Sequence, residues 1–269
     1  MPEQELSERL EFAIHAAKHV GKLTLEFFSR HDLGVETKGD GTPVTQADRL
    51  AERAFRELVD AHYPADAVAG EEYGTRPGTS RCTWIVDPID GTFSFIHGVP
   101  LFGTLIALEH AGQVTLGVVH MPAMNETAYA VRGGGAWLHT GSAKARRVSV
   151  SKTESLEEAT VCTTSADYFR AANCLDALDE LQRRVGHTRG WSDCYAALLL
   201  ISGRVDAVIE PLIQRWDVAA LHPILVEAGG QYSDWAGVDS IDSPNAVMSN
   251  GLIHDALLEL LSTHLRVED

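Results

Sequence analysis

The chain is poor in cysteine, in basic residues and in long apolar runs, and each shortage excludes a class of protein. Its 269 residues include four cysteines, with no C-x-x-C pair for a zinc ribbon or redox dithiol, which favours a reducing cytoplasm. Lys and Arg number 22 against 38 Asp and Glu, and the net charge of −16 disfavours nucleic acid and anionic membranes. No apolar run approaches the roughly 20 residues of a membrane span, and no signal-peptide pattern opens the sequence. We therefore expect a cytoplasmic protein whose partner is a small molecule.

The first half of the chain combines helical and strand-like patterns. Apolar residues at helical spacing predict a long helix over residues 4–30, and Thr45 with Asp48 is typical of a capping box that opens a second helix. From Cys82 onward, apolar runs separated by glycine turns predict an antiparallel meander. Its strands are expected over residues 84–86, 101–108, 114–120, 127–131 and 147–150.

Helices and strands alternate in the second half. We expect strands over residues 160–164 and 205–210, and helices over residues 168–185, 193–202, 217–228 and 252–265. This order predicts an α+β fold, layered as an αβαβα sandwich, in one domain over residues 1–269. Without a linker, its subdomains, about residues 1–152 and 153–269, should meet at a tight junction.

Residues 84–92, with the sequence WIVDPIDGT, are the most informative segment. An apolar strand delivers Asp87 and Asp90 to its end, with Pro88 stiffening the turn between them. Carboxylates this close repel each other, so keeping both ionised requires a cation. Oxygen ligands favour a hard ion, Mg²⁺ first and then Mn²⁺ or Ca²⁺. A turn without a ligand is the alternative, because Asp-Gly is also common turn chemistry.

Three further acidic segments are open to two interpretations: Gly70-Glu71-Glu72, Asp48 and Asp217. A solvated turn, a capping acid and a partner of the helix dipole would each explain one of them without any catalytic role. In combination with the two aspartates above, however, they form a pattern.

That pattern resembles the inositol monophosphatase family of Mg²⁺-dependent, Li⁺-sensitive phosphomonoesterases. The features that carry the resemblance are PVTQAD (43–48), GEE (70–72), WIVDPIDGTFSF (84–95), WDVAA (216–220) and EAGG (227–230). Their order and spacing agree with the family over nearly the whole chain. The resemblance implies an inositol monophosphatase-like fold and a homodimer.

The resemblance also implies roles for individual residues. The metal ligands for two or three Mg²⁺ ions, or for Mn²⁺, would be Glu71, Asp87, the backbone carbonyl of Ile89, Asp90 and Asp217. The catalytic residues that position and activate the attacking water would be Asp48, Glu71 and Thr92. The backbone N–H groups of Gly91 and Thr92 would bind the phosphate, and Asp217 would also contact the substrate. Lys38 matches a family lysine near the metals, and Ser94 replaces a usual asparagine.

Such a site suits hydrolysis of a phosphate monoester without a phosphoenzyme. The phosphate and the carboxylates repel each other, so metal ions must bridge them, lower the pKa of the attacking water and stabilise the leaving alkoxide. The sequence contains no G-x-S-x-G elbow, P-loop or C-x₅-R motif, which removes the main nucleophilic alternatives. We therefore expect a phosphoric monoester hydrolase.

Two more acids bear on the substrate. Asp193 lies in WSDCY, where inositol-cleaving members carry small residues, and Glu210 matches a family glutamate that contacts the non-phosphate part of the substrate. Together they predict an anionic pocket suited to an ammonium or imidazolium group. These two acids, together with the sequences of residues 102–108 and 229–235, resemble the histidinol-phosphatase branch of the family. The resemblance favours L-histidinol phosphate, an intermediate of histidine synthesis, as the substrate. Asp193 could also be the N-cap of the following helix.

Other functions stay open at this point. The main alternative is an inositol-1-monophosphatase acting on myo-inositol phosphates. A catalytically silent regulatory member is expected to lack a metal ligand or the Thr-Asp pair, and here all are present. A phosphatase for 3′-phosphoadenosine 5′-phosphate or fructose 1,6-bisphosphate needs cationic contacts for a second phosphate, and the sequence shows no obvious cluster.

Overall fold

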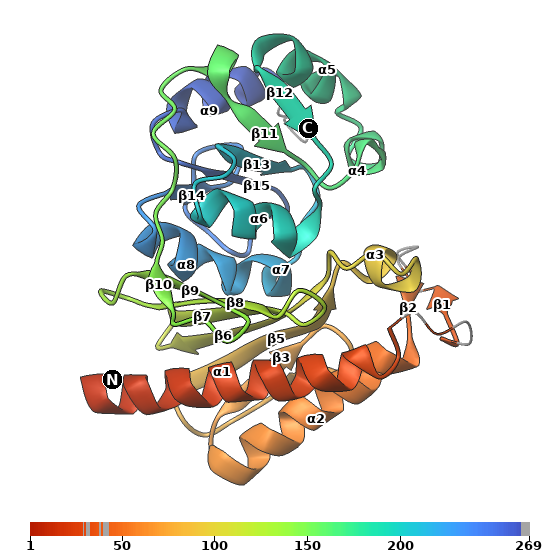
Figure 1. The fold of residues 1–269 in the computed structure, drawn as a ribbon, viewed down its shortest axis with the longest axis vertical. Coiled ribbons are helices and arrows are strands. Elements are labelled where there is room, and N and C mark those ends of the chain that lie inside the picture. Colours follow the sequence, from red (N-terminus) through yellow and green to blue (C-terminus); the bar gives the residue numbers. More distant parts are fainter. Residues whose placement is uncertain (29, 31–32, 38, 40–42, 265–269) are drawn as a thin grey trace.

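Two β-sheets lie between three layers of helices (Figure 1) in a computed structural model that describes residues 1–28, 30, 33–37, 39 and 43–264. The first helical layer contains α1 (Glu3–Leu25) and α2 (Gln46–His62). The middle layer contains α6 (Asp193–Ile201), α7 (Arg215–Ala219) and α8 (Leu221–Glu227). The last layer contains α4 (Ala166–Ala171), α5 (Leu175–Arg184) and α9 (His254–Ser262). The predicted αβαβα sandwich is confirmed.

The larger sheet has eight strands in the order β10-β9-β8-β7-β6-β5-β3-β4. Their bounds are β3 (Ala67–Gly70), β4 (Gly74–Arg76), β5 (Cys82–Asp90), β6 (Gly103–His110), β7 (Gln113–Met121), β8 (Glu126–Val131), β9 (Ala136–Thr140) and β10 (Arg146–Arg147). Strands β5 to β10 form the predicted antiparallel meander, whereas β3 runs parallel to β5. The strand predicted over residues 147–150 ends early, because the Val150 N–H bonds to the Ala228 carbonyl beyond α8.

The smaller sheet has five strands in the order β12-β11-β13-β15-β14. Their bounds are β11 (Thr160–Cys162), β12 (His187–Arg189), β13 (Ala207–Glu210), β14 (Gln231–Ser233) and β15 (Ala246–Ser249). Outside the sandwich, β1 (Glu36–Thr37) pairs with β2 (Pro43–Val44), α3 (Thr92–Ile96) follows β5, and a 3₁₀ turn covers Leu156–Glu158. The subdomain boundary near residue 152 stays a prediction.

Several predicted helices were wrong in their bounds. The last, predicted over residues 252–265, spans His254–Ser262, and residue 265 lies outside the described residues. The first ends at Leu25 and not at residue 30. The helix predicted over residues 168–185 is divided into α4 and α5, because Asn173 has a left-handed backbone with φ of 59°. A left-handed residue turns the carbonyl away from the helix axis, so the helical hydrogen bonds stop there.

The helix predicted over residues 217–228 also differs from the structure. It begins at Arg215 and is divided at Ala220 into α7 and α8. Pro223 lacks an N–H group and cannot donate to the carbonyl of Ala219 four residues earlier, which explains the break.

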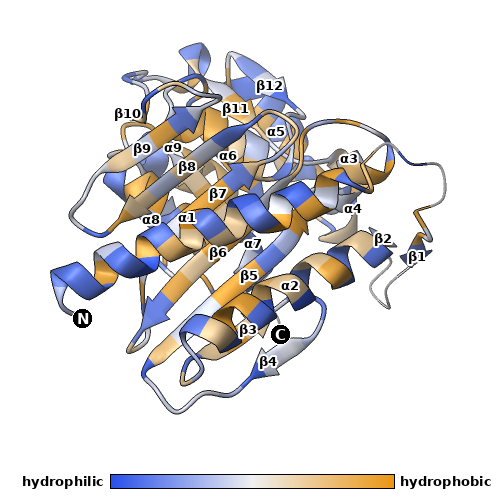
Figure 2. Ribbon diagram, turned by 60° about the horizontal axis from the view of Figure 1, so that its bottom comes forward, coloured by the Kyte–Doolittle hydropathy of each residue, from blue (hydrophilic) through white to orange (hydrophobic). Residues whose placement is uncertain are grey.

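The helices α1 and α2 bury their apolar faces against the larger sheet. Figure 2 shows both lying across it, with hydrophilic and hydrophobic residues alternating along each helix. Ala13 and Val20 from α1 and Phe55 and Val59 from α2 belong to one buried cluster with Trp84 of β5. Among the described residues, no helix is both long and apolar enough to cross a bilayer.

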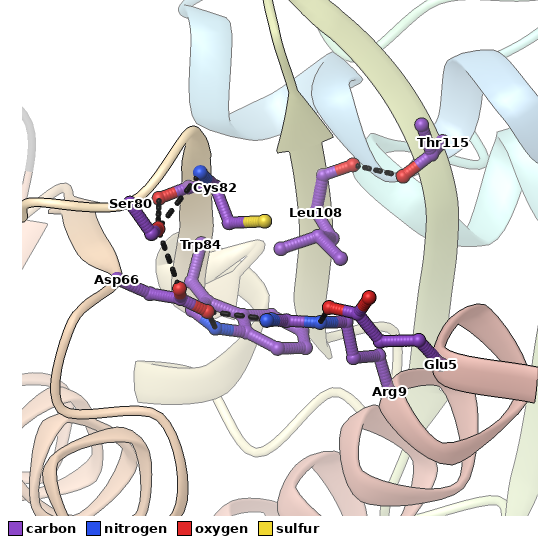
Figure 3. A network of polar contacts seen from close by, with 8 residues as sticks. All are labelled: Glu5, Arg9, Asp66, Ser80, Cys82, Trp84, Leu108 and Thr115. Carbon is purple, nitrogen blue, oxygen red and sulfur yellow. Dashed lines mark hydrogen bonds and ion pairs between the residues drawn. The ribbon is translucent and has the colours of Figure 1, made fainter. Parts of the chain in front are cut away.

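A buried polar network fastens α1 to this sheet (Figure 3). Asp66, just before β3, accepts hydrogen bonds through one oxygen from Arg9 Nη1 at 2.5 Å and from Trp84 Nε1 at 3.0 Å. Ser80 Oγ donates to its other oxygen at 2.6 Å. Arg9 also lies over the ring of Tyr63, 4.3 Å from its centroid. In this network the buried charges of Arg9 and Asp66 balance each other, and Asp66 also accepts the hydrogen bond of the Trp84 indole N–H.

Candidate active site

Asp87 and Asp90 lie at the end of β5, where the strand is irregular. Asp87 pairs with Leu105 and Asp90 pairs with Gly103 on β6, so β5 contains one extra residue in this stretch. Residues three apart on a regular strand face opposite sides of a sheet, and a bulge of one residue corrects this. The bulge at Pro88 and Ile89 therefore allows both carboxylates to reach the same side.

Asp217 comes from α7, in the other half of the chain. The backbone of Ala220, directly after α7, packs on Gly117 of β7, and a Cβ atom at Gly117 would lie only 2.0 Å from the Ala220 carbonyl oxygen. Only glycine permits this approach of the helix to the sheet. The Gln214 N–H donates to Asp217 Oδ2 at 2.8 Å as part of a capping box, which orients the carboxylate.

Three carboxylates thus converge, since ligand oxygens of Asp87, Asp90 and Asp217 all lie within 4.8 Å of one another. Burial and then the charge of Glu71 raise the pKa of Asp87 well above its usual range, and burial and then Asp193 do the same for Asp90. A divalent cation offsets such repulsion, and carboxylate oxygens are the donors that hard cations prefer. The residues therefore fit a metal site, and the identity of the ion stays a prediction.

Asp48 and Thr92 are also brought together. Thr92 Oγ1 lies 3.2 Å from Asp48 Oδ1 and 2.9 Å from the Ile89 carbonyl oxygen, within reach of donating to either. The predicted capping box is confirmed, because the Thr45 N–H donates to Asp48 Oδ2 at 2.8 Å and the Thr45 hydroxyl accepts from the helix backbone. Burial raises the pKa of Asp48 to about 6.

Glu71 follows β3 and lies close enough to this group to act on it electrostatically. After burial, its charge is the largest cause of the raised pKa of Asp87, and it contributes to the raised pKa of Asp48. Ile89 is buried, and its N–H donates to Asp87 Oδ1 at 3.0 Å. Lys38, the remaining residue expected near the metals, lies outside the described residues.

Gly91 occupies the turn between β5 and α3. Its φ of 85° is left-handed, and a Cβ atom there would lie 2.8 Å from the Leu101 carbonyl oxygen and 3.2 Å from Asp193 Oδ2. The start of α6 approaches the same turn, because the Cys194 N–H donates to Asp90 Oδ2 at 2.5 Å. The turn that carries Gly91 and Thr92 therefore lies between the β5 carboxylates and Asp193.

Asp193 and Glu210 are joined through a residue that the sequence did not indicate. The Thr164 N–H and hydroxyl donate to Glu210 Oε1 at 2.8 and 2.9 Å, and the Asp193 N–H donates to Thr164 Oγ1 at 3.1 Å. Within the described part of the chain, Glu210 Oε2 is buried without a hydrogen-bond partner. Burial raises the pKa of Asp193 to about 6 and that of Glu210 well above its usual range. No local motif marks Thr164, because its role depends on the packing of β11 beside β13.

The alternative role of Asp193 as an N-cap is wrong. Ser192 is the N-cap of α6, no side chain caps this helix, and Asp193 is its first residue with a left-handed φ of 55°. A non-glycine residue in this conformation costs of order 1–3 kcal/mol, and residues strained in this way cluster at functional sites. The strain thus coincides with the position at which sequence predicts a contact with the substrate.

Comparison with known proteins agrees with this geometry. The inositol monophosphatase family matches residues 5–266, and the chain belongs to this family. The predicted class of enzyme, a phosphoric monoester hydrolase, is confirmed, and members of the family depend on metal ions.

Individual relatives are similar over nearly the whole chain. A histidinol-phosphatase of Chlorobaculum parvum is 43% identical over 242 residues, which are 90% of this chain and 92% of that protein. A histidinol-phosphatase of Mycobacterium tuberculosis is 37% identical over 253 residues, 94% of this chain and 97% of that protein. The solved structure of a Thermotoga maritima IMPase has a TM-score of 0.85 at 35% identity and covers 95% of this chain and 97% of its own. The predicted fold and the likeness to the histidinol-phosphatase branch are confirmed.

Proposed function

We propose that this protein is a Mg²⁺-dependent phosphomonoesterase that hydrolyses L-histidinol phosphate to L-histidinol and phosphate, within histidine biosynthesis. The observation that carries the proposal is the acidic pair of half-buried Asp193 and buried Glu210, linked through Thr164 beside the carboxylate cluster. The two relatives named histidinol-phosphatase support the same substrate. By the family resemblance we also propose a homodimer, and by the scattered cysteines a cytoplasmic location.

In this proposal the carboxylate cluster holds the metal and the adjoining turn holds the phosphate. The ligands are Glu71, Asp87, the Ile89 carbonyl, Asp90 and Asp217, around two or three Mg²⁺ ions or Mn²⁺ in their place. When bound, these ions supply positive charge that lowers the pKa of water and stabilises the leaving alkoxide. The backbone N–H groups of Gly91 and Thr92 bind the phosphate, and Asp217 also contacts the substrate.

The attacking water is positioned and activated by Asp48 and Thr92, with Glu71 close by. The contact of 3.2 Å between Thr92 Oγ1 and Asp48 Oδ1 fixes the two groups relative to each other. Because burial raises the pKa of Asp48 to about 6, its carboxylate can accept a proton more readily than an exposed aspartate. These two residues therefore supply the path for the proton of the water.

A cationic substrate suits the second part of the site. L-Histidinol phosphate carries an amine and an imidazole, both able to donate to carboxylate oxygens. Glu210 Oε2 is buried without a hydrogen-bond partner among the described residues, so a donor from the substrate would relieve a costly unsatisfied acceptor. The negative charges of Asp193 and Glu210 lie near the phosphate site and would repel a substrate whose only charge is its phosphate. They therefore favour a substrate that also carries a positive charge.

Inositol-1-monophosphatase activity is the second candidate. It is supported by the solved structure of the Thermotoga maritima IMPase, because that neighbour shares the fold at 35% identity. Hydroxyl groups of a polyol can also donate to Glu210. A silent regulatory role is disfavoured, because the structure brings the acidic residues together in a geometry that fits a metal ion.

The substrate is tested by comparing kcat/KM for L-histidinol phosphate and myo-inositol 1-phosphate. We expect Asp193→Asn to lower kcat/KM for L-histidinol phosphate about 10- to 100-fold, because a charge-assisted hydrogen bond contributes about 1.5–3 kcal/mol. The value for myo-inositol 1-phosphate should change much less. Asp255→Asn, on the exposed start of α9, is the matched control and should leave both values unchanged. An unchanged ratio in Asp193→Asn would overturn the cation-pocket argument.

Metal binding should depend on pH. The pKa values of Asp48 and Asp193, about 6, lie above the ordinary 3.8, so these groups favour the folded state at low pH and lose that contribution as pH rises through about 6. Asp87 and Asp90 shift in the same direction. Because a metal ion binds the ionised carboxylates, the increase in Tm produced by Mg²⁺ should be larger at pH 7.5 than at pH 5. Thermal melts with Mg²⁺ or with chelator at both values measure this, and a shift that is equal or larger at pH 5 contradicts it.

A further inference from the structure

Glu52 is a fully buried carboxylate that takes no part in the site described above. It lies on α2 one turn after Asp48, so both side chains belong to the same face of that helix. Its surroundings are the turn between β3 and β4, which carries Glu71. The contacts of this buried carboxylate with the turn therefore indicate its function.

Both oxygens of Glu52 accept hydrogen bonds from the turn. Glu52 Oε2 accepts from the Glu72 N–H at 2.7 Å, and Oε1 accepts from the Tyr73 N–H at 3.2 Å. Arg56 Nε donates to Oε1 at 2.8 Å and balances the charge from the next turn of α2. Arg56 also donates to the Gly74 carbonyl. Glu52 thus binds two N–H groups of the turn, and Arg56 binds the carbonyl of the residue that follows it.

Gly70, at the other side of Glu71, lies directly against the same carboxylate. A Cβ atom at Gly70 would be 2.2 Å from Glu52 Oε1 and 2.4 Å from Cδ. Any larger residue must displace either the carboxylate or the backbone, because Glu52 is buried and fixed by these three hydrogen bonds. The backbone on each side of Glu71 is thus located by Glu52, at Gly70 by contact and at Glu72 by a hydrogen bond.

We propose that Glu52 is the positioning residue that holds Glu71 in place for metal binding, with Arg56 as its counter-ion. The inference rests on the role proposed above for Glu71 as a metal ligand. Asp48 lies on the same helix as Glu52, so α2 sets the distance between the water-activating Asp48 and Glu71. Outer partners of metal ligands typically change metal affinity 10- to 100-fold when they are replaced.

The test measures binding of Mn²⁺ to the whole protein by electron paramagnetic resonance, without any substrate. Glu52→Gln keeps the shape of the side chain but sets an amide NH₂ group against backbone N–H or guanidinium donors, so we expect the dissociation constant to rise about 10- to 100-fold. Gly70→Ala should weaken binding similarly. Glu57→Gln, exposed on the same helix, is the matched control and should bind like the unmodified protein.

A second measurement separates positioning from a general loss of structure. Because Glu71 is still present in Glu52→Gln, saturating Mn²⁺ should restore kcat for phosphate release, whereas Glu71→Gln should keep a lowered kcat at any metal concentration. Far-UV circular dichroism confirms that each variant is folded at the assay temperature. Should Glu52→Gln fail to fold, Gly70→Ala decides the matter, because the three atoms nearest to its added Cβ all belong to the Glu52 carboxylate.

Each outcome has one meaning. The inference is overturned if Glu52→Gln and Gly70→Ala bind Mn²⁺ as tightly as the unmodified protein while Glu71→Gln binds weakly. It is also overturned if Glu71→Gln itself binds normally, because Glu71 is then not a ligand. If the variants behave as expected but the unmodified protein does not hydrolyse L-histidinol phosphate, the proposed substrate fails and the positioning role stands.

Discussion

Replacing Asp90 by asparagine is expected to lower the rate of phosphate release at least about 100-fold, a loss that even outer partners of metal ligands produce. Asp90 lies within 4.8 Å of Asp87 and Asp217 through its ligand oxygen, so an amide at this position removes a charge from the centre of the cluster. The Cys194 N–H can still donate to the remaining carbonyl oxygen, which keeps α6 in place. Phosphate release with Mg²⁺ added and with excess chelator measures the effect.

The same substitution should not destabilise the metal-free protein. Burial and the charges of Asp193 and Asp217 raise the pKa of Asp90, which means that its ionised form is unfavourable in the folded state. In chelator, the Tm of Asp90→Asn should therefore equal or exceed that of the unmodified protein. Asp255→Asn, on α9, is the control for activity. Full activity of Asp90→Asn, or activity that persists in excess chelator, contradicts the metal mechanism.

Replacing Asp66 by alanine is expected to lower the free energy of unfolding by about 3–5 kcal/mol, the cost of breaking a buried ion pair from one side. Arg9 then keeps only its contact with Glu5 at 3.1 Å, and the Glu5 side chain is 44% exposed. The Arg9 side chain is 8% exposed and that of Asp66 is 3% exposed, so water cannot replace the lost carboxylate at Arg9 (Figure 3). The indole N–H of Trp84 loses its acceptor as well. Urea unfolding followed by tryptophan fluorescence measures the change.

A matched control for this prediction is available on the surface. Asp60 pairs with Arg76 at 2.8 Å, but its side chain is 56% exposed. Exposed pairs contribute only about 0–1 kcal/mol, so Asp60→Ala should change the free energy of unfolding by less than that. In the double variant Arg9→Met with Asp66→Ala, part of the loss should be recovered, because no buried guanidinium remains without its buried partner. Equal losses in Asp66→Ala and Asp60→Ala contradict this interpretation of the network.

Local signals in the sequence predicted much of the site. The apolar run before Asp87 and Asp90 indicated a strand that ends in carboxylates, and the spacing of Thr45 and Asp48 indicated a capping box. Each of these features depends on neighbouring residues, so periodicity and capping chemistry are sufficient to find them. The position of Asp217 beside the cluster needed the family resemblance, because nothing local connects α7 to β5.

The remaining features depend on contacts between distant segments. The helix over residues 168–185 looked continuous, since the left-handed turn at Asn173 leaves no clear mark in the apolar pattern. Thr164 joins Asp193 to Glu210 only because β11 pairs with β13. Glu52 reads as one more charged residue on an amphipathic helix until the packing of Gly70 against it is seen. Such features arise from tertiary packing, which overrides local preference.

The origin of the carboxylates in both halves of the chain has a consequence for folding kinetics. Asp87 and Asp90 end β5 of the larger sheet, whereas Asp217 lies on α7, after β13 of the smaller sheet. Contacts between segments so far apart form late, because long loops must close first. Interactions absent from the transition state act on the unfolding rate and leave the folding rate unchanged. A metal ion in this site would therefore mainly slow unfolding. It would lengthen the lifetime of the folded protein without raising the folding rate.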